Sequence, residues 1–231
     1  MTLLNISHFA ISRWGAFFNH FDLFFKGFLY TLGISFGALL LALILGILSG
    51  GLSTSKSKVG KLISRIYVEV FQNTPLLVQM VFVYYGLAII SNGHVMISAF
   101  FTAVLCVGLY HGAYISEVIR SGIEAVPKGQ TEAALAQGFT ANQTMQLIIL
   151  PQAVRTILPP MTNQVVNLIK NTSTVAIISG ADIMFVAKAW AYDTTNYIPA
   201  FAGAAIFYFV ICFPLASWAR KQEELNKKTY S

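Results

Sequence analysis

Phe28–Leu48 reads FLYTLGISFGALLLALILGIL and contains no charged side chain. The charge-free stretch around it is longer still, because no Asp, Glu, Lys or Arg lies between Lys26 and Lys56. A helix needs roughly 20 predominantly apolar residues to cross the hydrocarbon core of a bilayer. This stretch therefore predicts a membrane-spanning helix, and it decides the fold class of the chain.

The rest of the sequence repeats this pattern. Charged residues make up 10% of the 231 residues, whereas a soluble domain carries about 25%. Residues 70–116 and 194–219 contain no charge, and Lys170 is the only charge in residues 157–181. We therefore expect an all-α integral membrane protein with five transmembrane helices, near Phe28–Leu48, Leu76–Ile90, Val95–Ser116, Met161–Ile178 and Ile198–Trp218.

The second expected span has an alternative start. Its apolar run also fits the continuation of a helix that begins near Lys61. At its other end, residues 91–94 read Ser-Asn-Gly-His, a cluster of turn formers that separates it from the third span.

Basic side chains indicate the orientation. Eleven of the 15 Lys and Arg residues fall in the loop after the first span, the loop after the third span and the C-terminal tail. An excess of Lys and Arg in short loops marks the cytoplasmic side, so the N-terminus is expected outside and the C-terminus in the cytoplasm. Residues 1–23 then form an extracytoplasmic amphipathic lead-in, 24–220 the transmembrane domain with its cytoplasmic loop 120–151, and 221–231 a cytoplasmic tail. The net charge of +6 is a topology signal and predicts no nucleic-acid partner.

The loop 120–151 predicts two short helices joined at a sharp angle. Pro127 and Gly129 break the chain, and residues 130–137 are rich in helix formers. Gly138 stands where the end of a helix favours a residue that can adopt a positive φ.

The second helix of this elbow has its own start signal. Thr140 and Gln143 have the spacing of a capping box, and Pro151 ends or offsets the helix. We expect the elbow to expose a face of small residues, Ala133 and Ala134, against which another protein can pack closely. The alternative is a connector that merely lies on the membrane surface.

The same loop carries a sequence signature. Glu132-Ala133-Ala134 is followed by three residues and Gly138, then by nine residues, Ile148, one residue and Leu150-Pro151. This pattern resembles the EAA signature of bacterial ABC importer permeases at every position. The flanking segments are similar to the polar amino acid subfamily of the histidine/glutamine/glutamate type, at residues 71–79, 114–123, 128–130, 150–155, 159–160 and 170–173. The resemblance covers roughly residues 24–220.

The resemblance implies a division of labour. Two permease subunits, identical or sister chains, would form the solute pathway across the bacterial cytoplasmic (inner) membrane. Both would be surrounded by membrane lipid. Each would dock its elbow in an ATP-binding subunit, and an extracytoplasmic amino-acid-binding protein would deliver the solute for ATP-driven alternating access. ATP and Mg would be bound by the ATPase, so this chain is expected to be no enzyme and to bind no cofactor. The implied coupling residues are Glu132, Ala133, Ala134, Gly138, Ile148, Leu150 and Pro151.

A second polar constellation is Lys170-Asn171-Thr172-Ser173. Lys170 is expected about ten residues, or roughly 15 Å, into the fourth span, where an ionisable group costs on the order of 3 kcal/mol. We expect these residues to line the translocation pathway; alternatively, Lys170 pairs with a carbonyl or an acid inside the bundle. Many members of the subfamily that this chain resembles carry Asp where this chain has Asn171. Asn171 therefore favours acidic or neutral polar solutes, and Lys170 would suit a solute carboxylate.

Four more residues are candidates for the pathway. Glu117 and Arg120 lie three positions apart on one helix face, where a mutual salt bridge is favoured over solute contact. Asn73 and Gln79 lie at the start of the second span and would add polar groups.

The sequence shows no motif for chemistry of its own. No His, Cys, Asp and Glu cluster has ligand spacing, so no metal site is expected. No nucleophile elbow and no phosphate-binding loop occurs either. Two other classes remain as alternatives to an importer permease. A stand-alone secondary carrier or channel for small polar solutes would not need the elbow, and an intramembrane enzyme would need a catalytic pair at depth.

Overall fold

The computed structural model describes residues 11–230, which are helical and contain no β-strand. Residues 1–10 of the expected lead-in and Ser231 of the expected tail lie outside the described residues. The helices are α1 (Ile11–Asn19), α2 (Phe21–Thr54), α3 (Lys58–Gln72), α4 (Leu76–Val81), η1 (Phe82–Gly86), α5 (Leu87–Ile90), α6 (Ala99–Glu124), α7 (Lys128–Ala136), α8 (Ala141–Gln143), η2 (Thr144–Ile149), α9 (Leu150–Asn171), η3 (Thr172–Ile178), α10 (Ile183–Thr194) and α11 (Tyr197–Tyr230).

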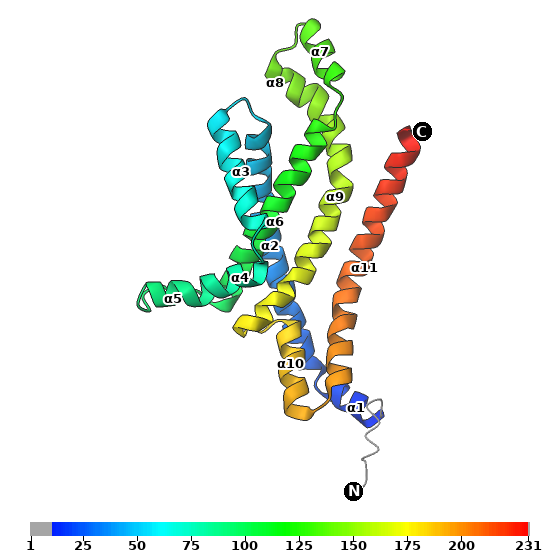
Figure 1. The fold of residues 1–231 in the computed structure, drawn as a ribbon. Helices are drawn as coiled ribbons and strands as arrows, with labels where there is room; N and C mark the ends of the chain where they lie inside the picture. Colours follow the sequence, from blue (N-terminus) through cyan, green and yellow to red (C-terminus); the bar gives the residue numbers. More distant parts are fainter. Residues whose placement is uncertain (1–10, 231) are drawn as a thin grey trace.

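Three helices in the described part are long and apolar enough to cross a membrane, namely α2, α6 and residues 197–221 of α11. Two bent pairs, α3 with α4–α5 and residues 141–178 with α10, raise the number to five if each pair is one span. The five expected spans fall on these elements. Figure 1 shows α7 and α8 at one end of the bundle, here called the elbow end, and α1 and α10 at the other.

The helix that corresponds to the expected third span begins later than the sequence indicated. Ser98 is the N-cap of α6, and its Oγ accepts a hydrogen bond from the Phe101 N–H at 3.4 Å. The helix therefore starts at Ala99 rather than at Val95, and it continues past Ser116 to Glu124.

The expected second span coincides with α4, η1 and α5, which together run from Leu76 to Ile90. Helix α3 begins at Lys58 and ends at Gln72, and after a break the chain turns through 96° into α4 and α5. Figure 1 shows this second part leaving the side of the bundle. Pro75 precedes α4 as its cap and has no N–H to continue α3. The alternative, a helix that begins near Lys61 and continues into this span, is therefore wrong as one continuous helix, because the chain bends by 96° between the two parts.

The fourth helix, in contrast, begins earlier than the sequence indicated. Helix α9 starts at Leu150, runs through Pro159 and Pro160, and passes into the 3-10 helix η3 at Thr172. Prolines inside such helices are tolerated because neighbouring groups satisfy the freed backbone atoms. The expected fourth span starts at Met161, directly after the proline pair, because prolines indicate a helix boundary. The observed helix starts 11 residues earlier.

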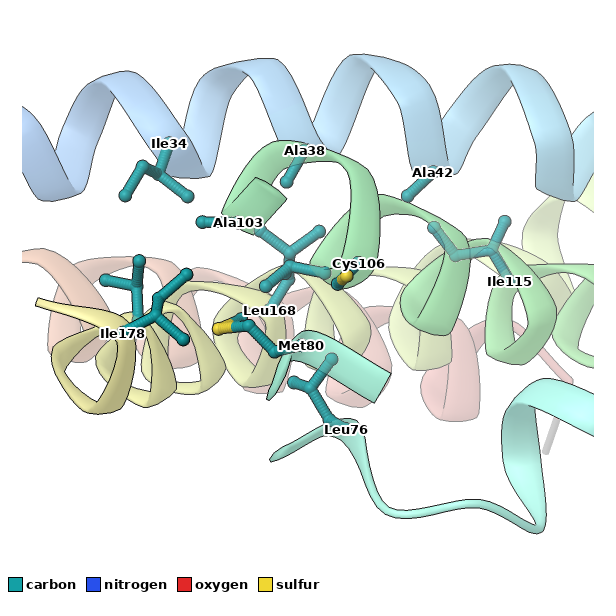
Figure 2. Packing of buried hydrophobic residues seen from close by; sticks show 12 residues of the cluster. Ile34, Ala38, Ala42, Leu76, Met80, Ala103, Cys106, Ile115, Leu168 and Ile178 are labelled. Atoms are coloured by element: carbon teal, nitrogen blue, oxygen red, sulfur yellow. The ribbon is translucent and has the colours of Figure 1, made fainter. Parts of the chain in front are cut away.

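The main core lies where α2 packs along α6. Figure 2 shows the small side chains Ala38 and Ala42 of α2 close to Ala103 and Cys106 of α6. The two helices approach so closely at Gly46 that a Cβ there would overlap the Ile115 side chain. Small residues at helix contacts permit this close packing in membranes.

A second core seals the end opposite the elbow. Phe17 of α1, Phe24 of α2 and Trp190 of α10 pack together, with Phe17 and Phe24 ring centroids 4.6 Å apart. Arg13 of α1 also donates to the Thr195 carbonyl at 3.0 Å. The described part of the lead-in is therefore a helix that is fixed to the bundle.

Candidate functional site

The elbow forms at Gly138, whose φ is +87°. Its N–H donates to the Leu135 carbonyl at 3.0 Å, and the Phe139 N–H donates to the Ala134 carbonyl at 3.1 Å. These bonds close the end of α7 in the way that a residue with positive φ permits. The predicted left-handed glycine is confirmed.

The predicted second helix of the elbow is confirmed as well. The Thr140 hydroxyl accepts from the Gln143 N–H at 3.3 Å, and Gln143 Oε1 accepts from the Thr140 N–H at 2.9 Å. Helix α8 then passes through the π-helix η2 into α9. Pro151 lies in the first turn of α9, so it follows an offset in the helix and does not end it.

The surface of the elbow differs from the expectation in one respect. Glu132 and Ala133 are exposed, but Ala134 is only 5% exposed and packs within the elbow. The face offered to a partner therefore contains Ala133 without Ala134. Among the other coupling candidates, Leu150 and Pro151 are exposed and Ile148 is half-buried.

The sequence did not reveal the residues that attach the elbow to the bundle. Thr144 is 2% exposed and Ile149 is 5% exposed. Gln152 of α9 also donates to Gln130 Oε1 of α7 at 3.3 Å. A hydrophobic position nine residues after a capping-box hydroxyl is too common a pattern to have identified this attachment.

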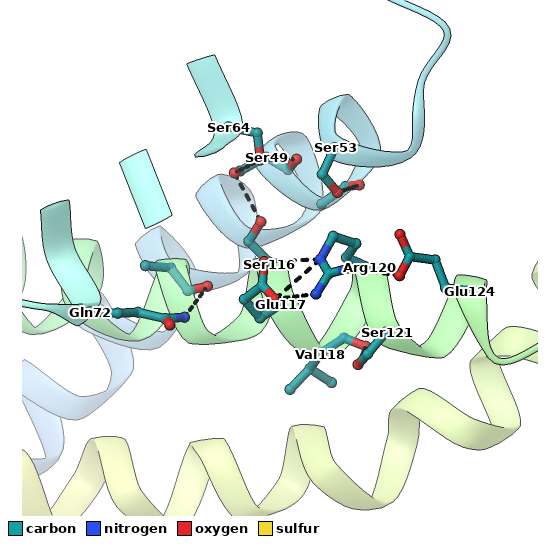
Figure 3. A network of polar contacts seen from close by, with 12 residues as sticks. Ser49, Ser53, Ser64, Gln72, Ser116, Glu117, Val118, Arg120, Ser121 and Glu124 are labelled. Atoms are coloured by element: carbon teal, nitrogen blue, oxygen red, sulfur yellow. Dashed lines mark hydrogen bonds and ion pairs between the residues drawn. The ribbon is translucent and has the colours of Figure 1, made fainter. Parts of the chain in front are cut away.

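Glu117 and Arg120 form the expected salt bridge near the elbow end of α6. Arg120 Nη2 lies 2.7 Å from Glu117 Oε2, and Nη1 lies 2.6 Å from Glu124 Oε2. Figure 3 shows the guanidinium held between the two carboxylates. A cavity of about 400 Å³ opens beside this network and is also lined by Lys61 and Arg65 of α3. These bonds use three of the five guanidinium N–H groups, and the Arg120 side chain is 36% exposed.

Three buried serines join α2, α3 and α6 next to this network. Ser49 Oγ lies 2.8 Å from Ser64 Oγ, and Ser116 Oγ donates to Ser49 Oγ at 2.9 Å. Figure 3 shows the three hydroxyls between the helices. They hold the polar side of α3 against the bundle.

The segment Lys170-Asn171-Thr172-Ser173, here called the polar turn, does not face a single cavity. Lys170 is exposed and lines two hollows beside α11 of about 290 and 440 Å³, in both cases together with Tyr208. Ser173 lines the smaller hollow, whereas Thr172 is fully buried. Asn171 points the other way, toward α6, where its Nδ2 lies 3.0 Å from His111 Nε2.

Asn73 and Gln79 are brought to the bend between α3 and α4. Asn73 Nδ2 donates to the Glu69 carbonyl at 2.8 Å. Gln79 Nε2 donates to the Thr74 hydroxyl at 2.7 Å and to the Phe71 carbonyl at 3.2 Å. Both amides therefore satisfy backbone and side-chain groups freed by the break, and none of their hydrogen bonds within residues 11–230 is to Lys170.

Two buried polar residues were missed by the sequence reasoning. His111 of α6 is 2% exposed and Asp182, before α10, is 0% exposed. Asp182 accepts from the Phe185 N–H at 2.9 Å and from the Tyr208 hydroxyl at 3.3 Å. An ionisable group inside a membrane bundle is a functional candidate by default. A search for isolated ionisable residues in apolar segments could have found both.

Metal chemistry has no assembled site in the described part of the chain. No group of three His, Cys, Asp or Glu side chains there could hold a metal ion. Cys106 and Cys212 are free, buried thiols on different helices.

Comparison with known proteins places this geometry in a family. Residues 42–224 match the family model described as "Binding-protein-dependent transport system inner membrane component". The probable glutamine ABC transporter permease protein GlnM of Bacillus subtilis (strain 168) is 34% identical over 92% of this chain and 97% of its own length. The probable amino-acid ABC transporter permease protein PatM of Vibrio harveyi is 36% identical over 85% of this chain and 89% of its own length.

Two solved structures of ABC transporters contain a chain with a similar fold. A chain from the "Crystal structure of an amino acid ABC transporter with histidines" superposes with a TM-score of 0.84 and 31% identity, over 91% of this chain and 97% of that one. A chain of the MetNI methionine ABC transporter in an inward-facing conformation has a TM-score of 0.69 at 16% identity, over 88% of this chain and 98% of that one, and shows the shared fold. The chain therefore belongs to the inner membrane components of binding-protein-dependent transport systems, as a membrane permease of the amino-acid ABC transporter type.

Proposed function

We propose that this chain is one permease subunit of a bacterial ABC importer for polar amino acids. It lies in the cytoplasmic membrane with its N-terminus outside and its elbow in the cytoplasm. The observation that carries the proposal is the elbow itself, in which Gly138 locks two helices at a sharp angle at one end of the bundle. A carrier or channel that works alone has no use for such a projection.

The elbow is the docking point for a separate ATP-binding subunit. Glu132 and Ala133 are exposed beside each other on α7. The carboxylate can meet a basic group of the partner, and the small Ala133 lets the partner approach closely. Because Thr144 and Ile149 are buried at the base of the elbow, movement of the ATPase is transmitted to α9 instead of being lost in a loose loop. ATP and Mg bind to the ATPase.

The polar turn contributes to the solute pathway of the permease pair, identical or sister chains. An extracytoplasmic binding protein delivers the solute, and ATP-driven closure of the ATPases rocks the helices between outward and inward openings. Lys170 is exposed next to two hollows, where its ammonium can bind a solute carboxylate. Glutamine, named for the relative GlnM, agrees with a neutral polar solute, one of the two classes that Asn171 favours.

The test is co-purification of the ATPase subunit with the tagged permease, together with solute uptake by cells that express the whole transporter. Glu132→Arg reverses the charge of the docking surface, and Gly138→Asp strains the left-handed position. We expect both variants to insert in the membrane but to lose the ATPase and uptake at least tenfold.

Matched controls separate docking from general damage. Gly129→Asp changes a glycine on the same helix that has open space around it and no positive φ, and Thr156→Arg adds a charge at an exposed position on α9. Both are expected to keep the ATPase. Intact assembly and uptake in both elbow variants would overturn the proposal.

A further inference from the structure

Residues 76–98, here called the arm, leave the side of the bundle as α4, η1 and α5 and return to α6 through a turn. The 96° bend after α3 makes the arm run across that helix rather than along it. Its helical part has 15 residues, or about 22 Å at 1.5 Å per residue. Figure 1 shows α5 at the far end of the arm, away from the other helices.

The root of the arm lies at the middle of the membrane-spanning part. Met80 of α4 is 0% exposed and belongs to the main core together with Ala38 and Ala42 of α2, as Figure 2 shows. These two alanines flank the centre of the charge-free stretch between Lys26 and Lys56. A segment that leaves the bundle at this level and runs across α3 stays at membrane depth.

The outer surface of the arm is apolar and large. The arm has no charged side chain, because residues 70–116 contain none. Eight of its large apolar side chains are between 43% and 80% exposed, namely Leu77, Val78, Phe82, Tyr85, Ile89, Ile90, Val95 and Met96. At roughly 150 Å² for a large side chain, they expose on the order of 700 Å², close to the roughly 800 Å² that each partner buries in a stable interface.

The tip of the arm is unsuited to lipid. The turn at residues 91–94 is polar and has positive φ at Asn92 and Gly93. The chain that follows it to the start of α6 is neither helix nor strand, and no hydrogen bond within residues 11–230 uses the N–H groups of Met96 and Ile97. Non-helical backbone at membrane depth is tolerated only where protein covers it or where it lines a water-filled cavity. Because the apolar side chains of the arm disfavour water, a protein partner is the cover that suits both.

We propose that the arm is the surface by which each permease subunit binds a second copy of this chain inside the membrane. This inference rests on the proposed function, which supplies a pair of permeases. The ATPase and the binding protein act on the two faces of the membrane, so neither reaches an arm at mid-depth. A two-fold pair makes the same contact twice, which doubles the apolar surface that is buried.

The arm also connects the partner to the polar turn. Thr174 Oγ1, directly after that turn, donates to Met80 Sδ of the arm at 3.8 Å. Leu76 and Met80 are buried in the same core as Val175 and Ile178 of η3. The contact with the second copy is therefore rooted next to the segment that contributes to the solute pathway of the pair.

The test uses the whole transporter in membranes of cells that express two copies of this chain with different affinity tags. A benzophenone side chain, which reacts on illumination with C–H bonds of lipid and protein alike, replaces Ile89 or Met96 of the arm in one copy. The controls carry it at Phe36 or Ile44 of α2, and all four positions are between 57% and 80% exposed. We expect several-fold more product that contains both tags from the arm positions than from the α2 positions, with the ATPase co-purifying throughout.

A second measurement removes surface from the arm. Phe82→Ala combined with Ile90→Ala should reduce the two-tag product from Met96 several-fold, because both side chains are exposed on the arm. Phe36→Ala combined with Ile44→Ala removes comparable surface from α2 and should leave that product unchanged.

The possible failures are distinguishable. Arm positions that react only with lipid, with the ATPase or with a different polypeptide would overturn the arm as the contact with a second copy, and so would equal two-tag product from the arm and from α2. Absence of the ATPase from every purified sample would overturn the proposed function, whereas two-tag product from the arm in those samples would still support the arm contact.

Discussion

The elbow and the polar turn both interrupt long helices, yet they are held in different ways. In the elbow, Thr140 bonds to Gln143 and Phe139 to Ala134, so the partners are three to five positions apart. In the polar turn, Asn171 meets His111, which is 60 positions away in the sequence. The comparison teaches that the bend of the proposed coupling device is locally encoded, although its attachment through Gln130 and Gln152 spans 22 positions, whereas the contact at the proposed solute site depends on how distant helices pack.

The largest expected effect is a loss of stability when the contact between α2 and α6, the helix that carries His111, is overpacked. Gly46→Val places side-chain atoms where Ile115 of α6 already lies, and overpacking of this kind costs about 3 kcal/mol. Thermal unfolding of the purified protein in detergent should show a large fall in Tm. Gly51→Val is the control, because a Cβ at Gly51 meets nothing within 4 Å. Equal stability of the two variants would show that the close contact of α2 with α6 is unimportant.

The next effect concerns the cap that follows the polar turn. Asp182→Ala removes the acceptor for the Phe185 and Met184 N–H groups, which should cost about 1–2 kcal/mol. Asp182→Asn keeps an acceptor oxygen and should lose less than half of that amount. Thermal unfolding of the two variants gives the comparison, and an alanine variant as stable as the asparagine variant would argue against the cap.

These two sites also show what the sequence could and could not predict. The charge gaps located the long helices, and the spacing of Gly138, Thr140 and Gln143 gave the elbow, because each signal lies within a few residues. The 96° bend after Gln72 and the contact of His111 with Asn171 were not predictable in this way. Both depend on which segments meet in space, and the Pro159–Pro160 pair resembled a boundary only because its neighbours were unknown.

A smaller effect should stay inside the elbow. Thr140→Ala removes the capping hydroxyl from the Gln143 N–H, a loss of about 1 kcal/mol. Because the cap is local, amide hydrogen exchange should accelerate at residues 141–144 while the Tm of the bundle changes little. Thr131→Ala, at an exposed position of α7, is the control. Faster exchange throughout α9 would show that the elbow is less independent than the comparison holds.

The smallest effect tests the serines between the helices. Ser116→Ala removes one hydrogen bond to Ser49, and such bonds in membrane bundles contribute about 0.6 kcal/mol on average. Ser121→Ala is the control, because Ser121 is exposed and its hydroxyl donates to the Val118 carbonyl of its own helix. Thermal unfolding should show a small loss for Ser116→Ala and none for Ser121→Ala. A loss of unfolding free energy above about 2 kcal/mol would exceed what a single hydrogen bond contributes in membrane bundles, and would contradict this minor role of the serines.

The most direct test of the central claim asks whether the elbow is covered by an ATPase on the proposed cytoplasmic face. Ala133→Cys introduces an exposed thiol, and the native Cys106 and Cys212 are buried. Inside-out membrane vesicles are treated with a membrane-impermeant maleimide, with and without the co-expressed ATPase subunit. The account predicts strong labelling at position 133 that falls several-fold when the ATPase is present. Equal labelling in both vesicles, or labelling only from the opposite face, would contradict it.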